Sequence, residues 1–276
     1  MKFCRFLTAS GARFGRVETR DGHDVIVEEM STPQMQVTSA GVPEQIVMAE
    51  PGKGKVLDEP FPLERAKLLA PFPIVSKILC VGRNYAAHVR ELNHEMPTEP
   101  LIFSKPPSSL LAPGGEILRP AISQRVDYEG ELGILIGRRC HLMAEGESAK
   151  DYILGFTIIN DVTARDLQNK DGQWTRSKGF DTFCPVGPIV NTELDPWSGI
   201  QVQTRLNGEM KQDGNTRDMM FSIDRIVQHI SQFCTLLPGD LIATGTPEGV
   251  GPMQAGDVVE VTVEGIGTLR NTIANA

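Results

Sequence analysis

The stretch VDYEGELGI, residues 126–134, brings two glutamates to the start of an apolar strand. Glu129 and Glu131 stand two positions apart, so in a strand both side chains leave the same face. Two carboxylates held this close are costly unless they are protonated, exposed to water or neutralised by a cation. Oxygen donors of this kind suit Mg²⁺, Mn²⁺ or Ca²⁺. The stretch therefore predicts a metal site, with a solvated strand end as the alternative.

A third carboxylate closes the next apolar run along the chain. Asp161 directly follows residues 153–160, which read ILGFTIIN. A carboxylate at the mouth of a buried strand is a natural third ligand for the same cation. Asp is also a favoured N-cap residue, and the segment 163–168 that follows could be the helix it caps. The spacing alone leaves both roles open.

Strand candidates outnumber helix candidates along the chain. The clearest helix is predicted at residues 221–234, where Ile223, Ile226, Val227, Ile230 and Phe233 fall on one face. Because strands and helices do not alternate regularly, the pattern predicts a β-rich α+β domain rather than a doubly wound parallel sheet. Apolar runs bounded by turn residues predict strands at residues 77–82, 100–105, 130–137, 153–161, 200–207, 240–245 and 257–265.

The first 73 residues differ in character from the rest. Short alternating segments at residues 13–19 and 23–29 predict strands, and the Pro- and Gly-containing stretch 49–64 predicts loops. We therefore expect a small β-rich N-terminal domain with a linker at residues 1–73. The main domain is expected at residues 74–276.

Composition limits the compartment and the partners. The five cysteines are scattered singly, which suggests neither a disulfide framework nor a thiolate metal site and fits a reducing cytoplasm. Acidic residues outnumber basic ones by 35 to 27 and no basic run is present, so nucleic acid and anionic membranes are not expected partners. No signal-peptide core and no run of about 18 apolar residues is found. We expect a soluble, cytoplasmic protein that acts on a small molecule.

A short helix is predicted at residues 84–92, with Asn84 as its cap. It carries His88 and Glu91 at i, i+3 spacing, which makes them neighbours on the helix surface. A carboxylate beside an imidazole fixes its tautomer and stabilises its charged form, as a general base that deprotonates water requires. An ordinary surface pair would show the same spacing.

Six motifs from about Lys77 to Thr272 resemble the fumarylacetoacetate hydrolase family, and they occur in the family's order. The resemblance implies a β-sandwich roll, usually dimeric, with a metal held by Glu129, Glu131 and Asp161. The motifs are VGRNYAAHVREL (81–92), PLIFSKPPSSLLAPG (100–114), YEGELGILIG (128–137), GFTIINDVTARDLQ (155–168), SKGFDTFCPVGP (177–188) and LIATGTPEGVG (241–251).

The resemblance also implies roles for other residues. His88 and Glu91 match the catalytic dyad of the acylpyruvate hydrolase and oxaloacetate decarboxylase subgroup, which a lid segment carries over the substrate. Lys178 matches an active-site lysine, and Thr246 matches a contact to the substrate carboxylate. Four further residues fall in matching motifs and are predicted to bind substrate: Arg83, Lys105, Arg165 and Gln168.

Together these residues predict a divalent-metal-dependent hydrolase that cleaves a C–C bond of an acylpyruvate-type 2,4-dioxo acid and that would also decarboxylate oxaloacetate. Mg²⁺ or Mn²⁺ is the expected ion, and Ca²⁺ is compatible with the same ligands. The family implies a homodimer that binds a small 2-oxo acid. Two alternatives stay open: an isomerase of 2-hydroxyhepta-2,4-diene-1,7-dioate type substrates, and a non-catalytic binder of 2-oxo acids.

Overall fold

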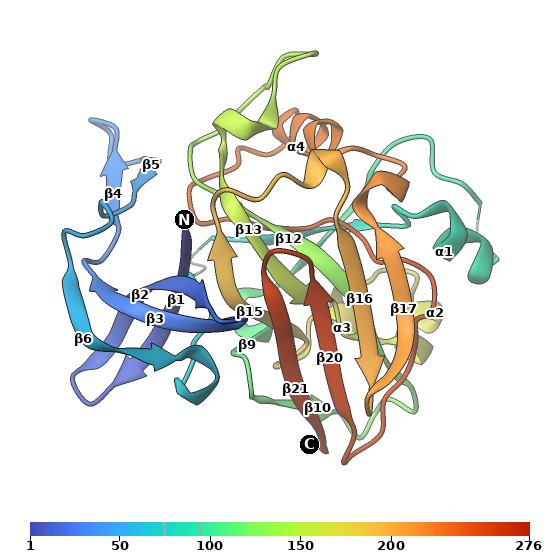
Figure 1. Cartoon of the computed structure of the whole chain (residues 1–276). Helices are drawn as coiled ribbons and strands as arrows, with labels where there is room; N and C mark the ends of the chain where they lie inside the picture. The colour runs from blue at the N-terminus through green and yellow to red at the C-terminus, as the bar shows by residue number, and fades with distance from the viewer. Residues whose placement is uncertain (74–75, 94) are drawn as a thin grey trace.

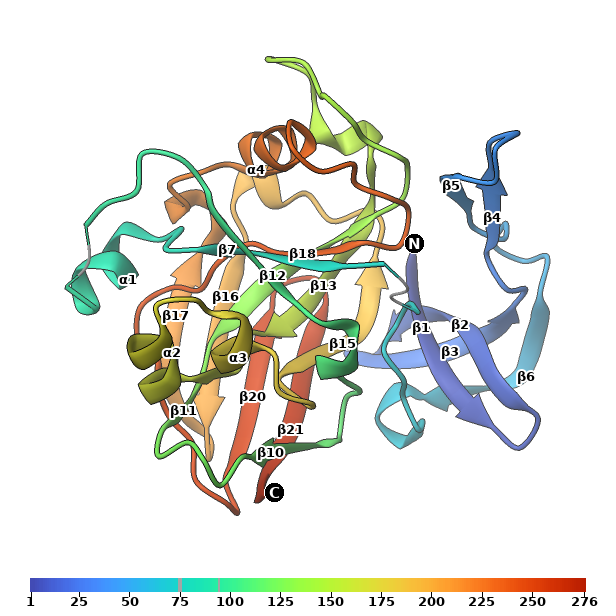
Figure 2. The ribbon, with the colours of Figure 1, turned by 180° about the vertical axis from the view of Figure 1, so that it is seen from behind.

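The computed structural model describes residues 1–73, 76–93 and 95–276. The N-terminal strands, blue in Figure 1, lie to one side of a larger roll of strands with short helices at its edge. In both Figure 1 and Figure 2 they lie on the side opposite helix α1 (Ala86–Glu91). The predicted domain boundary lies between residues 73 and 74. Residues 74 and 75, which follow it, are outside the described residues. No helix of the described part is long and apolar enough to cross a membrane.

One large sheet runs through both parts of the molecule in the order β6-β3-β2-β1-β15-β13-β12-β18-β7-β8. Neighbouring strands are antiparallel except for two parallel pairs, β18 with β7 and β15 with β9. This architecture confirms the predicted β-rich α+β class. The strands are β1 (Lys2–Thr8), β2 (Gly11–Arg20), β3 (His23–Met30), β6 (Lys55–Pro62), β7 (Ile78–Gly82), β8 (Leu101–Lys105), β12 (Gly130–Ile136), β13 (Ile153–Asn160), β15 (Cys184–Asn191) and β18 (Leu241–Ala243), with β9 (Leu110–Leu111) paired to β15.

Backbone pairing holds the N-terminal part against the main domain. Lys2 and Phe3 of β1 pair with Asn191 and Val190 of β15, so the sheet continues across the predicted boundary. A second contact involves the hairpin of β4 (Gln34–Val37) and β5 (Pro43–Val47), where Ile46 N donates to Gly137 O at 2.8 Å. The N-terminal part is therefore built onto the main sheet by hydrogen bonds, an arrangement that the sequence pattern did not indicate.

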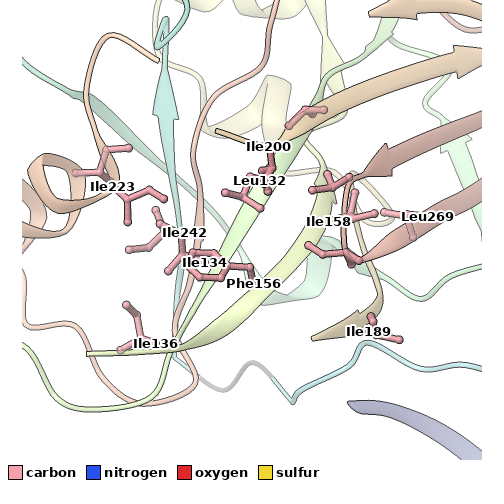
Figure 3. Close-up of a cluster of buried hydrophobic side chains, with 14 of the residues drawn as sticks. Leu132, Ile134, Ile136, Phe156, Ile158, Ile189, Ile200, Ile223, Ile242 and Leu269 are labelled. Atoms are coloured by element: carbon pink, nitrogen blue, oxygen red, sulfur yellow. The ribbon is translucent and has the colours of Figure 1, made fainter. Parts of the chain in front are cut away.

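A second sheet packs over the first and closes the core, which Figure 3 shows in close-up. Leu132 and Ile134 of β12 and Ile158 of β13 are buried there beside Leu269 of β21. Strand alternation explains the packing, because every second residue of β20 is buried while its neighbours are only partly covered. The strand order is β10-β21-β20-β16-β17, with β10 (Glu116–Arg119), β16 (Gln201–Leu206), β17 (Glu209–Asn215), β20 (Val258–Val263) and β21 (Gly267–Asn275).

The longest described helix, α4 (Ile223–Ser231), begins after Ser222, whose side chain accepts a hydrogen bond from Arg225 N at 3.3 Å. It lies within the predicted helix, and four of the five residues expected on its apolar face are buried. Phe233 is the exception and is 61% exposed. The prediction for Phe233 was wrong because the helix ends at Ser231, so its 3.6-residue period no longer applies two positions later.

The predicted cap of α1 was also wrong. Tyr85 is the N-cap, and no side chain caps the helix. The buried amide of Asn84 instead donates to the backbone oxygens of Thr244 (2.7 Å) and Phe221 (3.2 Å) and accepts from Phe221 N (2.8 Å). Asn84 therefore ties the start of this segment to two other loops, and the helix begins one residue later than a cap at Asn84 would require.

The buried carboxylate of Glu28 supports the N-terminal part. Burial opposes its ionisation, but hydrogen bonds from Arg16 Nε (2.7 Å) and from the N–H groups of Gly52 and Gly54 outweigh burial and lower the pKa of Glu28. A carboxyl whose folded pKa lies below the unfolded value, about 4.3, stabilises the fold above that pH. That stabilisation is lost as the pH falls through the folded value.

We expect Glu28→Gln to lower the free energy of unfolding at neutral pH by about 1–3 kcal/mol, because charge-assisted hydrogen bonds are replaced by weaker ones. Thermal denaturation between about pH 3 and pH 7 measures this, and the variant should lose less stability on acidification than the parent. Glu29→Gln is the matched control, since its side chain makes no hydrogen bond among the described residues. Identical acid slopes for parent and Glu28→Gln would contradict the assignment.

Candidate active site

The three predicted ligands meet at one end of the central sheet. Glu129 and Glu131 flank Gly130 at the start of β12, and Asp161 follows β13. Gly130 pairs with Asn160 in register, and Asp161 N donates to Glu129 O at 2.8 Å, so the two strand ends are adjacent. One carboxylate oxygen of each residue lies within 4.8 Å of the others. All three side chains are buried, and the alternative role of Asp161 as a helix cap is not seen.

Two buried lysines neutralise part of this cluster. Lys178 Nζ donates to Glu129 Oε2 at 2.7 Å and to Asp161 Oδ2 at 2.6 Å. Lys105 Nζ donates to Asp161 Oδ1 at 2.6 Å. Burial opposes the charge of Lys178, but Asp161 and Glu129 raise its pKa above the ordinary range. In this arrangement the two carboxylates favour the ammonium form of Lys178, which can stabilise negative charge.

Arg165 supplies the third cation. It begins helix α2 (Arg165–Asp171), its Nε donates to Asp127 Oδ2 at 3.0 Å, and its Nη2 donates to Glu129. Nη1 donates to Gln168 Oε1 at 2.6 Å, one helical turn along the chain. Burial opposes ionisation of Glu129, yet Lys178 and Arg165 lower the pKa of that carboxyl. Glu129 is therefore ionised with two cations beside it.

Among the described residues, Glu131 is the carboxylate of this cluster that forms no ion pair. Its carboxylate accepts a hydrogen bond from the backbone N–H of Gly245 at 2.7 Å. Burial, with repulsion from Asp161 and Glu129, raises the pKa of Glu131 well above its ordinary value. A divalent cation would supply the missing charge, and the three oxygen donors match the preferences of Mg²⁺, Mn²⁺ and Ca²⁺. The residues present therefore fit the predicted ion.

The predicted dyad is assembled at the same pocket. Nδ1 of buried His88 lies 3.3 Å from Glu91 Oε2. The backbone N–H of Gly249 also donates to the Glu91 carboxylate, at 3.0 and 3.1 Å to its two oxygens. Glu91 thus orients the imidazole and anchors α1 to the loop that follows β18. With Nδ1 directed at Glu91, Nε2 is the nitrogen left for substrate or water.

One pocket collects most of the predicted site residues. The pocket is small in this structure, with a cavity volume of about 30 Å³. Lys105 and Glu91 do not line it, but they contact Asp161 and His88, which do. No described residue of the N-terminal part contributes. The lining consists of Val81, Gly82, Arg83, His88, Leu92, Phe103, Glu129, Glu131, Asp161, Arg165, Gln168, Trp174, Lys178 and Thr246.

The hydroxyl of Thr246, predicted to contact the substrate carboxylate, makes hydrogen bonds within the protein. Its hydroxyl donates to Gly130 O at 2.9 Å and accepts from Gln212 Nε2 at 2.8 Å. Gln212 Oε1 in turn accepts from Gly130 N at 3.0 Å. This buried Gln212 network fixes the residue between the two glutamates. It was not predicted, because Gln212 lies far along the chain in a polar stretch with no local signal.

Asp127 was also missed, although a signal exists. It precedes Glu129 by two residues, so the alternation that pairs Glu129 with Glu131 extends back to it. Its buried carboxylate accepts from Arg165 and from Arg125 (2.8 Å), and it thereby holds Arg165 against the cluster.

Gly130 is required by its contacts. A Cβ atom there would lie 2.2 Å from Thr204 Oγ1 and 2.9 Å from Val261 Cγ1. We expect Gly130→Ala to cost about 1–3 kcal/mol of stability through overpacking and to displace both glutamates, so that metal affinity falls. Gly133→Ala in the same strand is the control for overpacking, since its Cβ would lie 2.8 Å from buried Ile159 but Gly133 does not stand between the glutamates. Calorimetric Mn²⁺ titration measures the difference, and equal affinities in the two variants would count against it.

Two family descriptions match the chain. Residues 77–274 match "Fumarylacetoacetate (FAA) hydrolase C-terminal", which covers the roll and every predicted site residue. This chain belongs to the fumarylacetoacetate hydrolase family. Residues 1–71 match "Rv2993c-like, N-terminal", so the small β-rich part is a separate domain type. Family membership confirms the resemblance drawn from the motifs. The members of this family are enzymes.

Relatives with similar sequences belong to the same family and carry several names. The chain is 54% identical over 198 residues to protein MJ1656 of Methanocaldococcus jannaschii, covering 72% of this chain and 83% of the relative. It is 39% identical to "Oxaloacetate tautomerase YisK" of Bacillus subtilis over 227 residues, covering 77% of this chain and 75% of the relative.

Among solved structures, the fold matches one titled 5-carboxymethyl-2-hydroxymuconate delta-isomerase, from Mycobacterium smegmatis. The TM-score is 0.83 at 42% identity, and the match covers all of both chains. The arrangement of the N-terminal domain on the roll therefore recurs in another protein.

Proposed function

We propose that this enzyme cleaves a C–C bond of an acylpyruvate-type 2,4-dioxo acid by way of the enolate of its 2-oxo end. The observation that carries the proposal is the position of His88. It lies in one pocket with the three carboxylates and Lys178, while Glu91 contacts its Nδ1. An oriented base and a lysine ammonium beside a metal-type ligand set are the groups that this cleavage needs.

Glu129, Glu131 and Asp161 would hold the divalent cation. When bound, it would polarise the keto and carboxylate oxygens of a 2-oxo acid as a Lewis acid. Lys178 contacts two of these carboxylates, so its ammonium lies close to where negative charge develops on the substrate. Arg165 and Gln168 are linked to each other and line the same wall, where they would orient the carboxylate end.

His88 would activate the attacking water. Its Nε2 takes a proton from water, and the resulting hydroxide attacks the C4 carbonyl carbon. The C3–C4 bond then breaks, and its electron pair passes to C3 of the pyruvate enolate, which Lys178 stabilises. Return of the proton from His88 to C3 gives pyruvate and a carboxylic acid, so atoms and charge balance. Loss of CO₂ from oxaloacetate gives the same enolate and needs no attacking water.

A second candidate is proton transfer between enol and keto forms of a 2-oxo acid, without C–C cleavage. The names of similar proteins favour it, since they include an oxaloacetate tautomerase and a delta-isomerase. The same residues would serve, with His88 moving a proton at carbon and Lys178 again stabilising the enolate.

A substrate panel separates these candidates. Acetylpyruvate, fumarylpyruvate, oxaloacetate and a 2-hydroxy-diene dioate are each assayed with Mg²⁺, Mn²⁺ and Ca²⁺, following pyruvate release and the ultraviolet spectrum together. Pyruvate from a dioxo acid supports hydrolysis. A spectral change without pyruvate supports proton transfer, and no change with any substrate would remove both proposals.

A further inference from the structure

Arg83 is an unpaired cation on the pocket wall. It directly follows β7, and its φ of +57° places a non-glycine residue in the left-handed region, which costs energy and is frequent at functional sites. Its Nε is buried without a hydrogen-bond partner. Among the described residues no carboxylate pairs with its guanidinium, although the side chain lines the pocket.

The other cations of this pocket behave differently. Lys178 and Arg165, which also line it, each contact two protein carboxylates. Their charges are therefore largely offset within the protein. Arg83 is the pocket cation with its charge still available, and a buried guanidinium nitrogen without an acceptor favours an anionic ligand.

Two aromatic rings separate Arg83 from the carboxylate cluster. Lys178 Nζ lies 5.0 Å from the centroid of the Phe103 ring, and that ring meets Trp174 edge to face at 5.0 Å between centroids. Arg83 Cζ lies over Trp174, 5.9 Å from its centroid. The two cations thus contact different rings of one pair. The pocket lining therefore includes two cations, Lys178 and Arg83, that are linked through this aromatic pair.

Gly82 leaves room for the side chain of Trp174. A Cβ atom on Gly82 would lie 2.6 Å from Trp174 Cζ3, so only glycine allows the indole this close to the end of β7. The stacking holds the guanidinium in place, and Trp174 precedes helix α3 (Thr175–Lys178), which carries Lys178. Short, packed segments therefore carry both Arg83 and Lys178.

We propose that Arg83 is a specificity-determining residue that binds the far carboxylate of a dicarboxylic 2-oxo acid. This rests on the proposed function, in which the 2-oxo end lies at the carboxylate cluster. A planar guanidinium accepts a carboxylate through two parallel N–H bonds, whereas an alkyl end would leave it unpaired. The enzyme then prefers substrates with an anion at each end over acylpyruvates that end in an alkyl group.

Matched ligands test the proposal on the Mn²⁺-loaded full chain. The probes are 2-oxoglutarate against 2-oxovalerate and 2-oxoadipate against 2-oxohexanoate, each pair differing by a terminal carboxylate in place of a methyl group. Oxalate carries the chelating end alone. Calorimetric titration gives each affinity for the parent, Arg83→Gln, Arg83→Lys and the control Arg90→Gln, which changes an exposed arginine of α1.

We expect the parent and Arg90→Gln to prefer the dicarboxylate of at least one pair by about 10–100-fold, the equivalent of one charge-assisted contact. Arg83→Gln should abolish that preference while oxalate affinity stays constant, which shows that the pocket is folded. If oxalate affinity falls in Arg83→Gln, Arg83→Lys carries the comparison and should keep only part of the preference.

Two results would overturn the inference in distinguishable ways. Oxalate binding with no dicarboxylate preference in the parent, or a preference that survives in both Arg83 variants, removes the role of Arg83 and leaves the proposed function intact. Failure of oxalate and every 2-oxo acid to bind the parent removes the proposed function and this inference with it.

Discussion

Glu131→Gln is expected to abolish tight binding of Mn²⁺ or Mg²⁺ and, with it, all turnover. Removing an outer-shell partner of a metal ligand typically costs about 10–100-fold in affinity, and loss of a ligand should exceed that. The amide has nearly the same shape, so the strand and its hydrogen bond from Gly245 can persist. Within the described part of the chain Glu131 is the cluster carboxylate without an ion-pair partner, so its charge is the one that a bound ion would satisfy most directly.

The metal-free variant should be at least as stable as the metal-free parent. Burial and repulsion from Asp161 and Glu129 make ionisation of Glu131 costly as the pH rises. Glutamine does not ionise, so the variant avoids that cost. A carboxyl with a raised folded pKa stabilises the fold at low pH and loses that contribution as the pH climbs through the folded value. Thermal denaturation in EDTA near pH 6 and pH 9 measures this pH dependence of stability, which should be larger in the parent than in Glu131→Gln. Glu145→Gln is the exposed control. Undiminished Mn²⁺ affinity in Glu131→Gln would disprove the ligand assignment.

Local sequence sufficed to predict the acidic cluster because its geometry follows from two short-range rules. Alternation put Glu129 and Glu131 on one face, and an apolar run ending at Asp161 put the third carboxylate at a strand end. The antiparallel register of β12 and β13 then made these ends adjacent. Asp127 obeys the same alternation, and its role beside Arg165 was predictable in principle.

Other features depend on contacts between distant segments and left no local trace. Gln212 reaches Gly130 across 82 positions of sequence. β15 was not among the predicted strands, because Pro185 and Pro188 interrupt it and proline removes a ladder donor. The pairing of β1 with β15 could not be predicted either, because the sequence of neither strand indicates its partner.

His88→Gln should keep metal binding and lose turnover. The imidazole contacts Glu91 and makes no hydrogen bond to the carboxylate cluster, so Mn²⁺ affinity should stay within about twofold of the parent. General acid–base catalysis by a positioned side chain typically contributes about 10²–10⁴-fold, and we expect a loss of that size in kcat for the dioxo acid. Glu91→Gln should cause a smaller loss, because Nε2 remains while its orientation weakens. The exposed His23→Gln is the control.

The reaction in which this loss occurs distinguishes two roles of His88. Hydrolysis of a dioxo acid needs a base for water, whereas decarboxylation of oxaloacetate needs none. If His88 acts on water, His88→Gln should lower hydrolysis far more than CO₂ release measured on the same preparation. Equal losses would place His88 at a step that both reactions share, the protonation of the enolate carbon. Because enol–keto transfer consists of that step alone, equal losses would favour the tautomerase candidate over the hydrolase.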